Sequence, residues 1–475
     1  MATSFASPSP FSVPGQLEQQ AGRLPPATPV YVLRGHSSPI HALRFYANNS
    51  RLISADADGW VVVWNMGTKR AVASWKAHES AVLGVEGVDF SSDRDRDEKG
   101  WSGSGSDRWV FTHGRDHKLR VWRLNLADEE VLSKELPVDE SRSTHSRNDP
   151  WMFHSLSVNA LNFCAFALCR VQFAMGDSEP SSEDTKQAPV FFLAVSNALN
   201  TGGIDIFHLP SEKRVSTISP DPSISTGMVM ALELLTTPQG RLCLVSGYED
   251  GRVMTHIQKS PKSLEKATVN QESPWTWERI YINRPHSQPV LSLALSPVGR
   301  KEDDRFFLSS SADAILAKHA ITTSKSPLKV VNTKHAGQQG MRIRNDGKIF
   351  ATAGWDCRVR VYSFKSMKEL AVLKWHKEGC YAVAFADVVG GENDEDMAGQ
   401  KATGEKDTIK SPGSETTPDT AAFDTDTKGG NMMLAQASTA KSLTAIKQQR
   451  SQKAQLTHWL AAGSNDGKIS LWDIY

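Results

Sequence analysis

The stretch Arg51-Leu-Ile-Ser-Ala-Asp-Ala-Asp-Gly-Trp-Val-Val-Val-Trp-Asn65 contains two short apolar runs joined by a polar turn. Leu52–Ala55 and Val61–Trp64 form the runs, and an Asp-Gly pair lies between them. Asp-Gly between apolar runs is a strong signal for a β-hairpin. The stretch therefore predicts two adjacent antiparallel strands, with Asp58 in the turn six residues before Trp64.

The spacing between this aspartate and this tryptophan recurs along the chain. The six pairs are Asp58/Trp64, Asp116/Trp122, Asp250/His256, Asp313/His319, Asp356/Tyr362 and Asp466/Trp472. In five of them a hydroxyl residue stands four positions before the aspartate: Ser54, Thr112, Ser246, Ser309 and Thr352. Such recurrence indicates an array of one small structural unit.

A third strand is predicted upstream of each hairpin. After His36, apolar residues follow at +4, +7 and +9, and the last two fit a strand with one buried face. The same spacing is found after His154, where it selects Val158, Leu161 and Phe163, and after His286 and His376. Ser225 takes the histidine position in another unit, and His78 and His335 precede looser versions of the pattern. It defines seven units with approximate limits 35–70, 77–127, 153–212, 225–262, 285–323, 334–367 and 375–475.

The repeated polar residues predict a hydrogen-bond set within each unit. A buried carboxylate must be satisfied, and His, Ser or Thr, and Trp each bring a donor. Bonds to a charged group contribute about 1.5–3 kcal/mol each, so a complete set would hold three strands together. The predicted members are His36, Ser54, Asp58 and Trp64; His78, Thr112, Asp116 and Trp122; His286, Ser309 and Asp313; His335, Thr352, Asp356 and Tyr362; and His376, Asp466 and Trp472.

Composition and motifs argue against several functional classes. The chain of 475 residues has a net charge of +1, which provides no global field for nucleic acid or membrane. Five scattered cysteines lack metal-ligand spacing and favour reduced thiols. No phosphate-binding Gly loop, zinc-protease helix or nucleophile elbow occurs. The His/Ser/Asp sets are superficially similar to a hydrolase triad, but their repetition favours a structural role. We therefore expect no catalytic residue, metal site, cofactor, small-molecule substrate, signal peptide or membrane span.

Several polar segments interrupt the units. Residues 1–27 are rich in Ser, Pro, Gln and Ala, and we expect a disordered tail. A low-complexity insert at 388–456 divides the last unit, and shorter ones lie at Asp89–Asp107 and Gly176–Gln187. Within the large insert, Met432–Gln455 lacks Pro and Gly, so a partner-docking helix is the alternative to a disordered loop.

Gly-His near the start of a unit and Trp-Asn or Trp-Asp near its end, as in Gly35-His36, Trp64-Asn65 and Trp472-Asp473, resemble the WD repeat. The resemblance implies an all-β fold, a single seven-bladed WD-repeat β-propeller in which an N-terminal strand completes the last blade. Val30–Leu33 is the apolar run in position for that role. Closure of this kind removes exposed sheet edges. Units 3 and 4 depart most from the pattern, since one lacks a well-placed aspartate and the other the histidine, and unit 7 has Ala462 at the hydroxyl position.

A propeller presents partners with the surface where its loops meet the central channel. The resemblance places there the residues just before the repeat aspartates, and Arg115, Glu249, Trp355 and Asn465 are the candidate partner contacts. Trp and Arg are enriched at interface hot spots. Packing of Trp355 on its own neighbouring loop is the alternative.

Within the WD family, the chain resembles the fungal ASTRA-associated proteins. The similarity rests on Thr28-Pro-Val-Tyr-Val-Leu-Arg-Gly-His, His113-Gly-Arg-Asp-His-Lys-Leu-Arg-Val-Trp and Gly354-Trp-Asp-Cys-Arg-Val-Arg-Val-Tyr. It implies a non-enzymatic nuclear scaffold of the ASTRA complex, linked to chromatin remodelling and to the Tel2–Tti1–Tti2 co-chaperone of phosphatidylinositol-3-kinase-like kinases, with no direct nucleic-acid or membrane contact. A histone-tail reader and a ubiquitin-ligase substrate adaptor are the alternatives, because fold alone does not define function.

Overall fold

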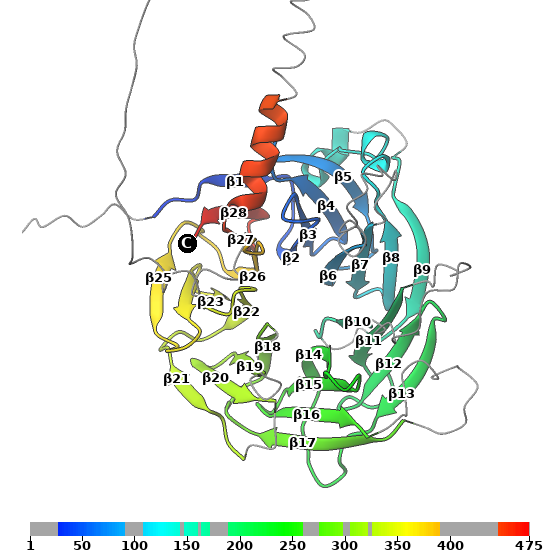
Figure 1. Ribbon diagram of the computed structural model, residues 1–475, viewed down its shortest axis with the longest axis vertical. Coiled ribbons are helices and arrows are strands. Elements are labelled where there is room, and N and C mark those ends of the chain that lie inside the picture. The colour runs from blue at the N-terminus through cyan, green and yellow to red at the C-terminus, as the bar shows by residue number, and fades with distance from the viewer. Residues whose placement is uncertain are drawn as a thin grey trace, which may run out of the picture.

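The computed structural model describes residues 27–90, 108–142, 147–159, 163–171, 189–259, 275–297, 305–321, 325–389 and 445–474. These residues form seven four-stranded antiparallel sheets arranged as a ring around a central opening (Figure 1). The innermost strand of each sheet faces the opening and the outermost strand forms the rim. The prediction of an all-β, seven-bladed propeller is confirmed.

Within each blade the strands follow the chain from the innermost to the outermost, except that β1 is the outermost strand of blade 7. Blade 1 is β2 (Ile40–Tyr46), β3 (Arg51–Asp56), β4 (Trp60–Asn65) and β5 (Arg70–Lys76); blade 2 is β6 (Val82–Asp89), β7 (Arg108–Gly114), β8 (Lys118–Arg123) and β9 (Trp151–Ser157). Blade 3 is β10 (Ala167–Val171), β11 (Val190–Ser196), β12 (Ile204–Leu209) and β13 (Lys213–Ile218); blade 4 is β14 (Val229–Thr236), β15 (Leu242–Tyr248), β16 (Val253–Gln258) and β17 (Trp277–Asn283). Blade 5 is β18 (Val290–Leu295), β19 (Phe306–Ser311), β20 (Ile315–Ala320) and β21 (Lys329–Asn332); blade 6 is β22 (Gln338–Ile343), β23 (Ile349–Gly354), β24 (Val359–Ser363) and β25 (Glu369–Leu373). Blade 7 is β26 (Cys380–Phe385), β27 (Trp459–Ser464), β28 (Lys468–Asp473) and β1 (Tyr31–Arg34).

The second strands are the most deeply buried because both faces of each sheet are covered by neighbouring blades. Every residue of β3 is buried, including the polar Arg51, Ser54 and Asp56. The first strand β2 buries Leu43 and Phe45 against blade 7, while Ala42 and Tyr46 contact blade 2. The period-2 pattern in the sequence thus reflects contact with two different blades rather than one buried and one solvated face.

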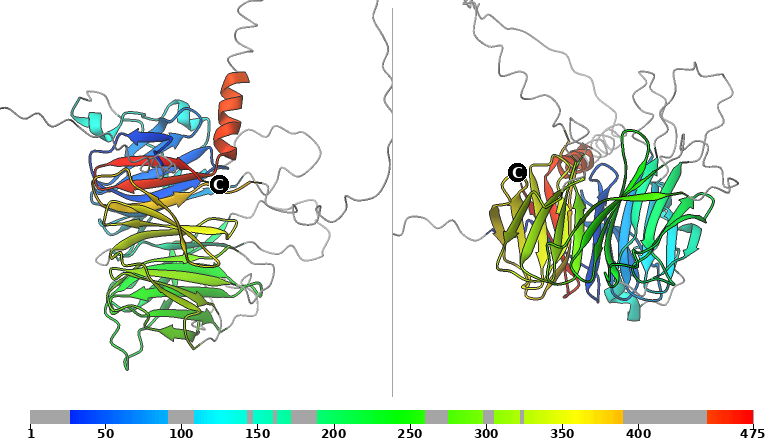
Figure 2. Two further views of the ribbon diagram at one scale, coloured as in Figure 1. Left: turned by 90° about the vertical axis from the view of Figure 1, so that its left-hand side faces the viewer. Right: turned by 90° about the horizontal axis from the view of Figure 1, so that it is seen from below.

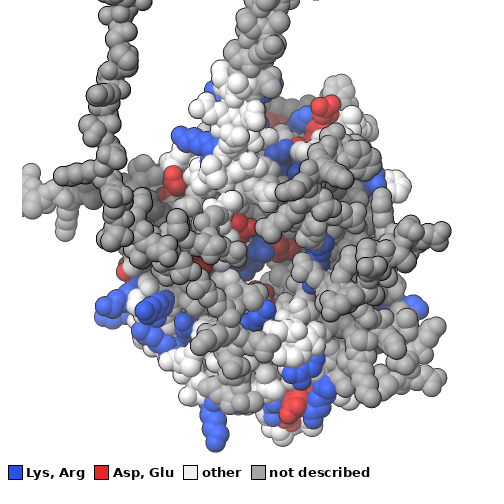
Figure 3. All heavy atoms as spheres, viewed as in Figure 1, with Lys and Arg blue, Asp and Glu red and all other residues white. Residues whose placement is uncertain are grey.

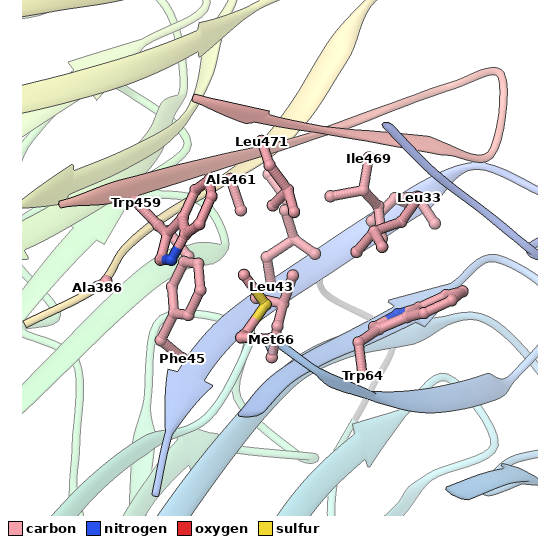
Figure 4. Close-up of a cluster of buried hydrophobic side chains, with 14 of the residues drawn as sticks. Leu33, Leu43, Phe45, Trp64, Met66, Ala386, Trp459, Ala461, Ile469 and Leu471 are labelled. Carbon is pink, nitrogen blue, oxygen red and sulfur yellow. The ribbon is translucent and has the colours of Figure 1, made fainter. Parts of the chain in front are cut away.

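The ring is closed by the N-terminal strand, as the family resemblance implied. β1 pairs with β28 in an antiparallel register that runs from Tyr31 opposite Leu471 to Arg34 opposite Lys468. Figure 4 shows the core at this junction, where Leu33 and Leu471 of blade 7 meet Leu43 and Trp64 of blade 1. This packing joins the first and last blades.

The boundary between blades 2 and 3 differs from the expectation. The template at His154 predicted the first strand of unit 3, but Trp151–Ser157 is β9, the outermost strand of blade 2. The innermost strand of blade 3 is Ala167–Val171 instead. Phe163, which the template assigned to a buried position, is 61% exposed. The prediction was wrong here because His154 itself lies in β9, so the spacing counted from it selects Val158 and Phe163, which lie in the connection between β9 and β10, and Leu161, which lies outside the described residues.

The connection from β8 to β9 forms a strap, residues 124–142, across the rim of blade 1. It contains two short 3-10 helices, η2 (Asp128–Glu130) and η3 (Pro137–Arg142). Ser133 accepts a hydrogen bond of 2.8 Å from Ser74 N on β5, and Gly35 O accepts one of 3.0 Å from Val138 N. The strap therefore covers the free edge of blade 1, which would otherwise present unpaired backbone groups.

A helix at 445–456 follows the large insert and is held to the ring at its C-terminal end. Ala454 is 3% exposed, and its carbonyl accepts a hydrogen bond of 2.8 Å from Trp459 Nε1. Residues 445–450 are exposed, and the helix lies on one face of the ring and extends beyond its rim (Figure 2). Part of the segment expected as a possible helix, Met432–Gln455, is thus helical. Residues 1–26, 91–107, 172–188 and 390–444, on which the predictions of disorder fall, lie outside the described residues.

Candidate functional site

A buried hydrogen-bond set occupies the centre of blade 1. His36 Nδ1 lies 2.7 Å from Asp56 Oδ2, and its Nε2 lies 2.7 Å from Ser54 Oγ. Trp64 Nε1 donates to the same hydroxyl over 2.8 Å. Because the hydroxyl accepts from Trp64, its own proton can be directed to the histidine, which leaves Nδ1 protonated to donate to the carboxylate. The set links β3, β4 and the segment before β2.

The carboxylate of this set is Asp56 and not Asp58, which corrects the sequence prediction. Asp56 is fully buried, and its Oδ1 also accepts from the backbone N–H groups of Asp58 and Trp60 over 3.0 and 2.9 Å. Asp58 is exposed and accepts a hydrogen bond from Ser38. The turn contains two aspartates. Asp58 has the six-residue spacing to Trp64, but Asp56 is the one that reaches His36.

Blade 2 places its aspartate where the repeat spacing predicted it. His78 Nδ1 lies 2.9 Å from Asp116 Oδ1, and Thr112 Oγ1 lies 2.8 Å from His78 Nε2 and 2.9 Å from Trp122 Nε1. The position that corresponds to Asp56 is Gly114, where a Cβ would come within 2.3 Å of His78 Nδ1. The glycine therefore leaves the space through which Asp116 reaches the histidine.

Electrostatics keep the Asp116 carboxylate ionised. Burial alone would raise its pKa, but hydrogen bonds and charges from His78 and Arg120 hold the pKa well below its ordinary value of 3.8. Arg120 Nη1 donates to Asp116 Oδ2 over 2.8 Å. Burial lowers the pKa of His78, which favours the neutral imidazole.

Blade 5 has a histidine in place of the tryptophan. His286 Nε2 lies 2.8 Å from Ser309 Oγ and its Nδ1 lies 3.2 Å from Asp313 Oδ1. His319 Nε2 contacts the same hydroxyl at 2.9 Å, and Tyr281 lies 2.8 Å from its other ring nitrogen. The fully buried His319 has its pKa lowered to about 3 by burial, so it acts as a neutral hydrogen-bonding ring.

Blade 7 supplies its hydroxyl from a residue that sequence reasoning missed. His376 Nε2 lies 2.8 Å from Ser470 Oγ, and Trp472 Nε1 donates to that hydroxyl over 2.9 Å. Ser470 pairs directly across β27 and β28 with Ala462, the position where the hydroxyl was expected. The nearest oxygen of Asp466 is 3.8 Å from His376 Nδ1. A search of the facing position on the third strand would have found Ser470.

The predicted set of blade 6 is not assembled. His335 is half exposed, and its Nδ1 lies 3.9 Å from Asp356 Oδ2. Asp356 is bound instead by Arg360, whose Nη1 donates to it over 3.1 Å. Thr352 and Tyr362 are buried on β23 and β24, and Tyr362 stacks on Phe350 with 5.0 Å between ring centroids. Packing and an ion pair replace the histidine network here.

Blades 3 and 4 use other groups in place of the repeat residues. In blade 3, Asn197 Oδ1 accepts from Leu199 N and Asn200 N, as an aspartate would in this turn, and Asn197 Nδ2 donates to Asp205 over 2.9 Å. Asp205 is 5% exposed and also accepts from Thr217 over 2.6 Å. In blade 4, Ser246 donates to Tyr248 over 3.1 Å. Sequence reasoning overlooked Asn197 and Asp205 because neither has the repeat spacing.

The geometry of these sets suits internal fastening better than nucleophilic catalysis. The four hydroxyl residues are fully buried, so their hydroxyls have no open path to a substrate; they are Ser54, Thr112, Ser309 and Ser470. Each hydroxyl also lies close to both a histidine and a second ring N–H or nitrogen in its own blade. A nucleophile needs an accessible oxygen next to its base.

The turns between the second and third strands define one face of the ring, here called the top face. On this face six residues donate the same backbone hydrogen bond to the loop before the first strand: Ala57, Arg115, Glu249, Ala312, Trp355 and Asn465, to the carbonyls of Pro39, Ala81, Met228, Pro289, Gly337 and Gly379 respectively. The shared bond holds their side chains at equivalent places around the channel mouth. The helix at 445–456 follows the first strand of blade 7 and so lies on the opposite face.

The four candidate contacts differ in how firmly they are held. Trp355 is 47% exposed, and its Nε1 donates to Gln339 Oε1 over 2.6 Å. The Arg115 guanidinium lies 4.5 Å from the ring centroid of the exposed Phe163. Glu249 Oε2 accepts from Met228 N over 3.0 Å, and Asn465 Nδ2 donates to Glu378 over 2.7 Å. A fixed orientation lowers the entropic cost of binding.

The described residues lack two features that would indicate other kinds of site. No cluster of three or more His, Cys, Asp or Glu side chains suited to a metal ion is present among them. In the same residues, no helix has the length and apolar character needed to cross a bilayer.

Comparison with known proteins identifies the family. A family model described as ASTRA-associated protein 1 matches residues 29–472. The ASTRA-associated protein 1 of Aspergillus niger is 52% identical over 467 residues, covering 95% of this chain and 98% of the relative. That of Penicillium rubens is 49% identical over 476 residues with the same coverage, and that of Schizosaccharomyces pombe is 32% identical over 389 residues, covering 75% of this chain and 93% of the relative. The chain belongs to the ASTRA-associated protein 1 family.

Proposed function

We propose that this protein is a non-enzymatic scaffold subunit of the ASTRA complex that binds other subunits through its top face. The supporting observation is the ring of equivalently placed side chains there, with Trp355 exposed and held by Gln339. The curated relatives are named for association with ASTRA. Aromatic and arginine side chains of this kind are typical anchors of protein interfaces.

Finer assignments follow from the same proposal. The complex acts in chromatin remodelling in the nucleus, and its partners include the Tel2–Tti1–Tti2 co-chaperone that matures phosphatidylinositol-3-kinase-like kinases. The sets described above hold the blades rigid, so that loops from different blades can present one continuous surface. Catalysis has no part in this proposal, because the histidines and hydroxyls that could provide it are used inside the blades.

The test replaces three top-face side chains together, Arg115→Ala, Glu249→Gln and Trp355→Ala. The tagged full chain is purified from a fungal host, and Tel2, Tti1, Tti2 and the other co-purifying subunits are identified by mass spectrometry. We expect loss of these partners with a melting temperature close to that of the parent protein. Trp151→Ala, at a 69% exposed tryptophan on the outer rim, is the matched control and should retain them. Retention of every subunit by the triple variant would rule out the top face as the binding surface.

A further inference from the structure

Four charged side chains lie at one level of the central channel. Arg44, Glu86, Glu233 and Arg342 line a cavity of about 670 Å³, and Figure 3 shows basic and acidic side chains around the central opening. Their level is set by strand register, because each is paired with the residue just before the hydroxyl position of its blade: Ile53, Phe111, Val245 and Ala351 respectively. The four come from the innermost strands of blades 1, 2, 4 and 6.

Two of the four neutralise each other. Arg44 Nε donates to Glu86 Oε1 over 2.8 Å, and the two residues lie on adjacent blades. Each side chain of this pair keeps some contact with the channel, at 40% and 23% exposure. Each charge of this pair therefore already has its partner within the protein.

Glu233 and Arg342 have no such neighbour. On the blade that follows Glu233 the equivalent residue is Ala294, paired with Leu308, and on the blade that follows Arg342 it is Ala384, paired with Ala461. Within the described part of the chain no ion pair involves either charged group, and Arg342 Nε is buried without a hydrogen-bond partner. One carboxylate and one guanidinium thus remain without a direct ion-pair partner in the same cavity, two blades apart, and act on each other only at a distance. Arg342 Nη1 donates to Met341 O over 3.2 Å.

Both groups are affected by this environment. Burial raises the pKa of Glu233 to about 7, although Arg342 and Arg44 oppose the shift. Burial likewise lowers the pKa of Arg342. A buried charge without a partner is costly, and a ligand that supplies the missing partner recovers that free energy on binding.

We propose that the central channel binds a small zwitterion, whose cationic group pairs with Glu233 and whose carboxylate pairs with Arg342. Guanidinium groups bind carboxylates through two parallel hydrogen bonds, which favours a carboxylate on the part of the ligand that faces Arg342. The cavity volume falls within the range of small-molecule sites, about 300–1,000 Å³. The closed Arg44–Glu86 pair leaves the ligand to the other two groups.

The proposal implies a pH dependence, since the cationic group requires ionised Glu233. With a pKa of about 7, its ionised fraction rises from about 9% at pH 6 to about 91% at pH 8. The other titratable or charged groups facing the channel are His41, Arg44, Glu86, Arg170, Tyr381 and Asp387. Burial lowers the pKa of His41, so this ring opposes the effect little. Affinity should therefore increase about tenfold between these two pH values.

The test titrates the full-length protein calorimetrically with glycine, 4-aminobutyrate and 6-aminohexanoate, whose charged groups are separated by increasing lengths. We expect at least one of them to bind at pH 8, about tenfold more weakly at pH 6, and the best member to bind at least tenfold better than butylamine or butyrate alone. Absence of binding by all three at pH 8, or equal binding of a single-charge probe, would overturn the proposal.

Variants locate the site. Glu233→Gln and Arg342→Gln should each weaken binding at least tenfold, and Glu233→Gln should also remove the pH dependence. Glu130→Gln and Arg123→Gln make the same charge changes at exposed residues outside the channel and should bind as the parent protein does. If a glutamine variant has a lower melting temperature, Arg342→Lys keeps the charge but loses the bidentate geometry and should still bind more weakly. Parent-like binding by the folded channel variants would place the ligand elsewhere.

Discussion

One buried ion pair joins the strap to blade 1 in addition to the backbone hydrogen bonds, and Glu129→Ala tests its contribution to stability. Arg51 Nε and Nη2 donate to the two carboxylate oxygens of Glu129 over 2.8 and 2.7 Å, and both side chains are only 9% exposed. Removing one partner of a buried pair costs about 3–5 kcal/mol, because the remaining charge stays buried. Arg51 keeps one bond of 3.0 Å to Ser50 O, so we expect a loss of about 3 kcal/mol, at the low end of that range.

The assay is chemical denaturation combined with hydrogen exchange. The unfolding midpoint should fall in Glu129→Ala, and amide protection should be lost first in residues 124–142 and at Ser74, whose N–H is bonded to Ser133 O. The exposed neighbour Glu130→Ala is the control and should change stability by less than about 0.5 kcal/mol. A double-mutant cycle with Arg51→Ala should give strongly non-additive effects. Additive effects, or a Glu129→Ala protein as stable as the control, would refute the assigned role of the pair.

Two further predictions concern the hydrogen-bond sets. Ser470→Ala removes the common partner of His376 and Trp472, and denaturation should show a loss of about 1–3 kcal/mol that Ser470→Thr partly restores; no loss would mean that blade 7 is held by packing alone. The pKa of Asp116 is depressed in the fold, so its contribution to stability is present above the unfolded value near 3.8 and is lost as pH falls further. The stability of Asp116→Asn should consequently fall less steeply than that of the parent below pH 4, and parallel acid titrations of the two proteins would contradict this assignment.

The repeat of the ring could be predicted from the sequence because its polar residues must stand at fixed spacings to form their hydrogen bonds. Asp116, Thr112 and Trp122 lie where their spacing placed them, since Gly114 leaves the space through which Asp116 reaches His78. The closing strand was implied by the family resemblance, and the apolar run ahead of the first Gly-His indicated which residues form it.

What failed to follow from the sequence depends on contacts between strands. The six-residue spacing selects Asp58, but the carboxylate beside His36 is that of Asp56, because Asp56 is the side chain that is buried there. Ser470 replaces the hydroxyl missing at Ala462 from across the sheet, a substitution visible only once the strand register is known. The strap is not part of the repeat, so no sequence pattern predicts that Glu129 pairs with Arg51 of blade 1.

Closure by β1 has a consequence for how the molecule is made. β1 is the first of the described strands in the sequence and is hydrogen-bonded to β28, the last of them, so the described strands of every blade are synthesised before the two can meet. A nascent chain emerging from the ribosome therefore holds an incomplete ring, with the edge of β28 still to be formed and β1 unpaired. Such edges invite intermolecular pairing, and a chaperone that shields Tyr31–Arg34 during translation would protect the ring during this interval.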